Sequence, residues 1–166
     1  MTAAGDPILL FPGQGTEALG MGLGWEAQRP WVAALEAAEA HTGKPLRRLM
    51  EAGPLEALRA QRVAPYAVLA HAVGVFRAWQ AAGLRPRAAA GHSMGFYSAL
   101  VAAEVMPLEA AFQLFDAVED LAETAFAATP MGMAFIIGVD EAELAEALRP
   151  HPELARSNRN GRAQFT

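Results

Sequence analysis

The sequence predicts an α/β fold in which parallel strands are covered by helices. Three observations support this prediction: a continuous apolar run at 7–11, a glycine-rich G-H-S-M-G turn at 91–95, and alanine-rich segments of helical periodicity around them. Along the chain the order is strand, helices, strand, turn, helix, helix, as an α/β layered core requires. At 166 residues the chain is long enough to bury a sizeable core.

In the first part of the chain, the sequence predicts two strands, with helices between them and after the second. The run at 7–11 is wholly apolar, as expected of a strand buried on both faces of a parallel sheet, and the segment 12–15 ends it. The small apolar run at 88–90 is the second predicted strand. The positions of proline and glycine and the helical spacing of apolar residues predict helices over 31–41, 46–50, 55–60, 65–82, 96–105 and 107–127. In the helix over 65–82, the residues at core-facing spacing are Val68, Leu69, Val73, Phe76 and Trp79.

The pattern changes at Thr129-Pro130, and we expect a first domain over 1–128 and a second, smaller one beginning in 129–166. A strand is predicted within 133–139. Asp140 and Glu143 form a capping-box pattern that opens a helix to Leu148. Two short strands, 155–158 and 163–166, are expected around an Asn160-Gly161 hairpin turn.

Composition excludes several classes of protein. Hydrophobic residues make up 53% of the chain and charged residues 19%, which excludes general disorder. The net charge is −5 and the 13 basic residues form no stripe, so a nucleic-acid partner is not expected. There is no cysteine, hence no thiolate metal site. No apolar run approaches the ~20 residues that span a membrane. Residues 1–6 lack a signal-peptide pattern, so we expect a cytoplasmic protein.

The G-H-S-M-G turn at 91–95 has the pattern of a nucleophile elbow, in which a serine lies between a strand and a helix. Only glycine fits at the two flanks of so sharp a turn. Ser93 then lies at the start of a helix, where free N–H groups and the helix dipole favour an oxyanion. The alternative is a glycine-rich turn in which the serine is incidental.

A second glycine-rich motif, F-P-G-Q-G at 11–15, follows the first predicted strand. The two motifs should lie together, because the carboxyl ends of parallel strands meet at one edge of a sheet, where ligands bind. There the Gln14 amide and the backbone N–H of Met94 could hold a tetrahedral oxyanion. The alternative is a tight turn with a solvated Gln14. The motif is too short for a phosphate-binding loop.

Together the motifs resemble those of the acyl-CoA:acyl-carrier-protein acyltransferases, above all the malonyl-CoA:acyl-carrier-protein transacylase family. The segments 20–22, 136–140 and 158–160 fit the same pattern, so the resemblance covers nearly the whole chain. It implies an α/β-hydrolase-like core with a parallel sheet, and the start of a ferredoxin-like small subdomain. It also implies a role in fatty acid or polyketide synthesis.

By this resemblance, Ser93 takes an acyl group, malonyl or another, from coenzyme A and passes it to the phosphopantetheine thiol of acyl carrier protein. Gln14 and the Met94 N–H would form the oxyanion hole. The other pocket residues would include Gly13, Gly15 and His92. No permanently bound cofactor and no metal are implied, since the coenzyme A thioester is a substrate.

Three positions depart from the family's pattern. Val118 stands where malonyl-specific members carry an arginine that clamps the free carboxylate. Phe96 replaces a glutamate, and Ala64 replaces a glutamine. All three changes make the pocket less polar, which favours an apolar acyl group or a site that has lost selectivity.

No histidine of this chain is identified as the general base that would take the Ser93 proton. His41 and His71 fall in predicted helices as packing or surface residues, and His151 is the only histidine after Ser93. The family's catalytic histidine lies beyond the position that matches Thr166. We therefore interpret the chain as the N-terminal part of an acyltransferase, with the rest missing from a fragment or carried by another segment. Two alternatives stay open: a non-catalytic homologue that binds an acyl thioester or carrier protein, and a serine esterase that uses His151.

Overall fold

The computed structural model describes residues 7–129 and 131–166. Contacts divide the chain into two compact units, one up to Asp120 and one from Leu121 onward. The expected division after residue 128 stays a prediction. The expectations for residues 1–6 and for Pro130 lie outside the described residues. Within the described residues, no helix is long and apolar enough to cross a membrane.

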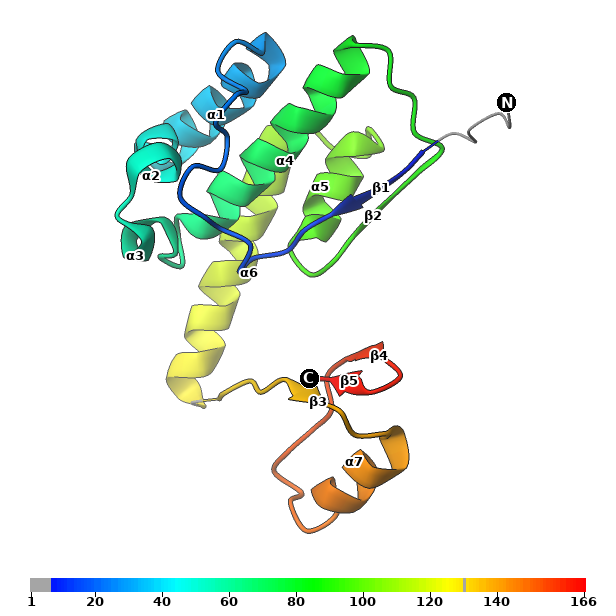
Figure 1. Cartoon of the computed structure of the whole chain (residues 1–166). Coiled ribbons are helices and arrows are strands. Elements are labelled where there is room, and N and C mark those ends of the chain that lie inside the picture. The colour runs from blue at the N-terminus through cyan, green and yellow to red at the C-terminus, as the bar shows by residue number, and fades with distance from the viewer. Residues whose placement is uncertain (1–6, 130) are drawn as a thin grey trace, which may run out of the picture. The chain divides into compact units, whose positions relative to one another are not determined.

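The first unit contains a two-stranded parallel sheet of β1 (Ile8–Phe11) and β2 (Ala88–Gly91). The register runs from Ile8 beside Ala88 to Phe11 beside Gly91. The two strands therefore end at the same edge, and the segments that follow them leave the sheet together (Figure 1). The predicted parallel sheet is confirmed.

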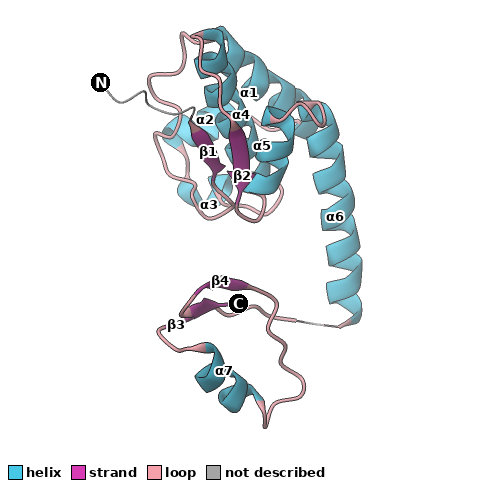
Figure 2. Cartoon of the chain, turned by 90° about the vertical axis from the view of Figure 1, so that its right-hand side faces the viewer, coloured by secondary structure: helices cyan, strands magenta, loops and turns pink. Residues whose placement is uncertain are grey.

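Helices cover one face of this sheet. Phe11 is buried against Phe76 of α4 (Ala64–Ala81), with ring centroids 6.3 Å apart, and against Ala99 of α5 (Gly95–Ala102). Leu10 points to the opposite face and is 79% exposed. The prediction of a strand buried on both faces is therefore wrong. Its alternate residues face opposite sides, and within the described part of the chain the packed helices lie on one side only (Figure 2).

The remaining helices of this unit agree with the sequence in number and order. They are α1 (Arg29–Thr42), α2 (Leu46–Ala52), α3 (Leu55–Leu58) and the larger part of α6 (Leu108–Ala128), whose last residues belong to the second unit. Two details differ. Trp79 is half exposed instead of buried, because its ring packs beside Trp25 at the surface, with centroids 6.3 Å apart. Helix α5 ends at Ala102 instead of 105, because Glu104 adopts a left-handed φ of 57° that cannot continue a helix.

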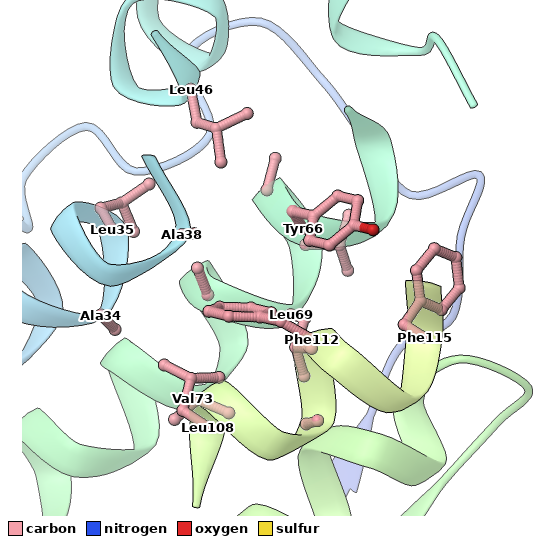
Figure 3. Close-up of a cluster of buried hydrophobic side chains, with 14 of the residues drawn as sticks. Ala34, Leu35, Ala38, Leu46, Tyr66, Leu69, Val73, Leu108, Phe112 and Phe115 are labelled. Carbon is pink, nitrogen blue, oxygen red and sulfur yellow. The ribbon is translucent and has the colours of Figure 1, made fainter. Parts of the chain in front are cut away.

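The core lies between α1, α4 and α6. Helices α1 and α4 approach closely at Gly74, where a Cβ would lie 2.8 Å from the Cα of Trp31. Phe112 of α6 is fully buried, and its ring lies 5.8 Å from that of Tyr66 (Figure 3). The core residues of the helix over 64–81 are buried as predicted, with the exception of Trp79. This packed layer supports the sheet edge from which the two glycine-rich loops emerge.

The second unit is a small α/β module. Its antiparallel sheet has the order β3-β5-β4, formed by β3 (Ile136–Ile137), β4 (Arg159–Gly161) and β5 (Gln164–Phe165). Asp140 opens α7 (Glu141–Leu148) with the predicted capping box, its carboxylate accepting from the Ala142 and Glu143 N–H groups.

Two predictions for this unit are wrong in detail. The strand predicted over 133–139 is reduced to two residues, because β5 pairs with Ile136 and Ile137 only. The hairpin turn lies at 162–163 and not at Asn160-Gly161. The register shifts between Arg159 and Gly161, so the Asn-Gly pair occupies an irregularity within β4.

Candidate active site

The turn between β2 and α5 is built as a sharp elbow with Ser93 at its tip. Ser93 has a φ of 52°, in the left-handed region that non-glycine residues seldom occupy and that is often found at functional sites. The Gly95 N–H donates to the His92 carbonyl at 2.9 Å, which closes the turn. A Cβ on Gly91 would collide with the backbone of Gly95, and one on Gly95 would lie 2.6 Å from the Pro12 carbonyl oxygen. Both flanking glycines are therefore required by space.

The first helical turn after the serine is where we predict the oxyanion hole. Met94 is the residue that caps α5, and its side chain is buried in the core. Among the described residues, its backbone N–H meets no hydrogen-bond acceptor. Ser93 is exposed beside it. A free N–H at a helix start beside an exposed hydroxyl is the arrangement that an oxyanion hole needs.

The structure brings the two glycine-rich motifs into direct contact. The His92 N–H donates to the Phe11 carbonyl at 3.1 Å, which extends the pairing of the strands into the loops. A Cβ on Gly13 would lie 2.8 Å from the His92 carbonyl oxygen and 3.3 Å from the Cβ of Ser93. Gly13 is thus the residue that lets the F-P-G-Q-G loop lie against the elbow. The adjacent Gln14 is exposed next to this contact.

For the other predicted pocket residues, the structure gives their position and exposure but few contacts with Ser93. The His92 ring lies beside Gly13, since a Cβ there would be 3.5 Å from its Nδ1. Phe96, in the first turn of α5, is 55% exposed. Val118 is half exposed on α6, and Ala64 is fully buried at the start of α4. Gly15 is exposed in the loop, with a φ of 96°. The pocket roles of these residues stay predictions.

Two of the histidines are held by partners other than the serine. The Trp31 indole N–H donates to His71 Nδ1 at 3.0 Å, and burial lowers the pKa of His71. His41 Nε2 lies 2.7 Å from Asp116 Oδ2. Partial burial alone would raise the pKa of Asp116, but hydrogen bonds from Tyr66 and His41 outweigh it and hold this pKa below its ordinary value.

His151 lies in the second unit, where its Nδ1 is 3.2 Å from Glu153 Oε1. In the described part of the chain, no histidine forms a hydrogen bond with Ser93. The same residues contain no group of three or more histidine or carboxylate side chains that could hold a metal ion.

Two residues that the sequence-based predictions did not include brace the F-P-G-Q-G loop. The Thr16 hydroxyl donates to the Gly13 carbonyl at 2.9 Å, and the Gly15 N–H donates to Glu17 Oε1 at 2.8 Å. Glu17 is only 4% exposed. The available signal was a threonine directly after a glycine turn, a residue type that often bonds a nearby backbone group.

Comparisons with known proteins give a family and several similar solved structures. The family described as the acyl transferase domain matches residues 8–163. A search of curated proteins gave no match. The structure is similar to an acyl-carrier-protein S-malonyltransferase from Burkholderia pseudomallei, with a TM-score of 0.82 and 30% identity over 96% of this chain and 53% of that one.

Two further solved structures extend this likeness. An acyl carrier protein S-malonyltransferase from Vibrio cholerae has a TM-score of 0.81 and 34% identity over 95% of this chain and 53% of that one. A malonyl-transacylase in complex with its type II polyketide synthase acyl carrier protein has a TM-score of 0.79 and 32% identity over 96% of this chain and 53% of that one. The chain thus spans about half the length of these proteins. Because the family match extends from β1 to beyond β4, the chain belongs to the acyl transferase domain family.

Proposed function

We propose that this chain carries the nucleophile and oxyanion-binding part of an acyltransferase that moves an acyl group from coenzyme A to acyl carrier protein. The observation that carries the proposal is the contact of Gly13 with His92 and Ser93, which brings the glutamine loop to the serine elbow. Acyl transfer needs a nucleophile and oxyanion donors within reach of one carbonyl. The malonyltransferases and the carrier-protein complex among the similar structures support the choice of donor and acceptor.

In the first half-reaction, Ser93 Oγ attacks the thioester carbonyl and loses its proton, while coenzyme A leaves as the thiol after taking up a proton. In the second, the phosphopantetheine thiol loses its proton as it attacks the Ser93 ester, and Ser93 Oγ takes up a proton as it leaves the new thioester. Both tetrahedral intermediates place a negative oxygen beside the elbow. We assign its stabilisation to the Met94 N–H and the Gln14 amide, since the first meets no acceptor within the described residues.

The acyl group is proposed to be apolar or small instead of malonyl. By the family resemblance, Val118 stands where malonyl-specific members carry an arginine that binds the free carboxylate, and Phe96 and Ala64 make the pocket less polar. Burying a carboxylate without a partner costs several kcal/mol, so malonyl-CoA would be a poorer donor than acetyl-CoA or a longer acyl-CoA. The guanidinium of Arg62 reaches α6 and bonds Asp120 Oδ1 at 2.6 Å.

The experiment is intact-protein mass spectrometry after incubation with acetyl-CoA, malonyl-CoA and longer acyl-CoAs. We expect an acyl adduct that disappears in Ser93→Ala. The matched control is Ser98→Ala, in the same helix, which removes a buried hydroxyl without a hydrogen-bond partner and should leave the adduct in place. Absence of an adduct with every donor, from a folded chain of the full gene's length, would contradict the proposal. Turnover of simple esters that depends on His151 would indicate a hydrolase instead.

A further inference from the structure

Glu17 is a buried carboxylate in the loop that carries Gln14, and neither the sequence motif nor the transfer chemistry uses it. Its side chain is 4% exposed, in a protein whose other carboxylates lie largely at the surface in the described segments. Burying a carboxylate is costly unless it is hydrogen-bonded. Here the Gly15 N–H donates to Glu17 Oε1 at 2.8 Å.

This hydrogen bond is one of several that hold the loop on both sides of Gln14. On one side, the Thr16 hydroxyl donates to the Gly13 carbonyl at 2.9 Å, while Gly13 abuts the elbow. On the other, Glu17 holds Gly15 at a φ of 96°, a conformation that an unrestrained glycine would leave readily. The loop is then anchored by the Gly20 N–H, which donates to the Met50 carbonyl at 2.7 Å.

We propose that Glu17 is a positioning residue for acyl transfer: by accepting from the Gly15 N–H, it holds the loop so that Gln14 faces the oxyanion formed at Ser93. The inference rests on the proposed function of Ser93 and Gln14. Glu17 itself does not touch the acyl group. Its contribution lies in keeping the Gln14 donor in place before the reaction, so that no loop ordering is needed in the transition state.

The chain offers a matched control in a second glycine turn. The Gly24 N–H donates to Glu26 Oε1 at 3.0 Å, Gly24 has a φ of 87°, and Glu26 is exposed. Glu26→Ala therefore removes the same type of bond at the same spacing, away from the elbow. It should leave both loop protection and Ser93 acylation unchanged.

The first measurement is hydrogen exchange of the segment 12–17, which does not depend on activity. Glu17→Ala should speed exchange of the Gly15 amide about tenfold, the loss expected for one hydrogen bond. Glu17→Gln keeps an acceptor oxygen and should stay near the wild-type rate. Unchanged exchange in Glu17→Ala, with the fold intact by circular dichroism, would overturn the proposal.

The second measurement is the rate of Ser93 acylation at saturating acyl-CoA. Glu17→Ala should lower this rate about tenfold, a fraction of what the loss of a whole oxyanion donor costs, with little change in KM and with rescue by Glu17→Gln. In a Gln14→Ala background the same substitution should have no further effect, because no side chain is left to position. An equal effect in both backgrounds would overturn the proposal. If wild type forms no adduct, the proposed function fails, while the exchange measurement still decides the role of Glu17.

Discussion

The contact between the two glycine-rich loops can be tested by adding a single methyl group at Gly13. The Gly13→Ala Cβ would lie 2.8 Å from the His92 carbonyl oxygen, which is backbone and cannot rotate away. The loop and the elbow would have to separate by roughly 0.5 Å, and such overpacking costs about 1–3 kcal/mol of unfolding free energy. The φ of Gly13 lies outside the left-handed region, so the penalty comes from the contact and not from the backbone conformation.

The assay is urea unfolding followed by the fluorescence of the chain's three tryptophans. With a slope of about 1–1.5 kcal/mol per molar urea, the midpoint should fall by roughly 0.7–3 M. The control is Gly132→Ala, since a Cβ there meets nothing within 4 Å. The same variant should acylate Ser93 more slowly, because a small misplacement of catalytic groups is costly. A Gly13→Ala protein within about 0.5 kcal/mol of wild type would refute the contact.

Three further predictions concern the core, the response to pH and the acyl group. Phe112→Ala removes a fully buried ring and should cost about 3–5 kcal/mol in urea unfolding, whereas Leu121→Ala, at an exposed position, should change little. Burial lowers the pKa of His71, so the neutral imidazole contributes to the folded state at neutral pH, and this contribution is lost as the pH falls below the ordinary histidine value. The free energy of unfolding should therefore drop between pH 7 and 5. Equal drops in wild type and in His71→Gln would contradict this. The lowered pKa of Asp116 should add a further loss as the pH falls through the ordinary aspartate value. Val118→Arg should raise malonyl labelling of Ser93 relative to acetyl labelling, and an unchanged ratio by mass spectrometry would place Val118 outside the acyl pocket.

Much of the local structure was predictable because short-range signals specify it. The Asp140 capping box, the end of α1 at Gly43 and the order of the helices follow from caps, periodicity and breakers within a few residues. The predictions failed where the register of strand pairing decides the outcome. The hairpin turn moved from Asn160-Gly161 to 162–163 because the register with β5 overrides the preference of the dipeptide.

By itself, the sequence determined that the chain has a serine elbow and a glutamine loop, each after a short strand. These features depend on the glycines and on residues next to them, so they can be recognised locally. It also determined that Phe96, Val118 and Ala64 are apolar, and the expectation for the acyl group follows from the family resemblance at these positions.

Only the tertiary structure decided how these parts meet. Gly13 touches the Ser93 elbow because β1 and β2 are paired in register across a long stretch of chain, and neither motif encodes that distance. The burial of Glu17, the partners of His41 and His71, and the one-sided cover of the sheet depend in the same way on packing between distant segments. Packing of this kind is cooperative and long-range, so residue patterns along the chain do not reveal it.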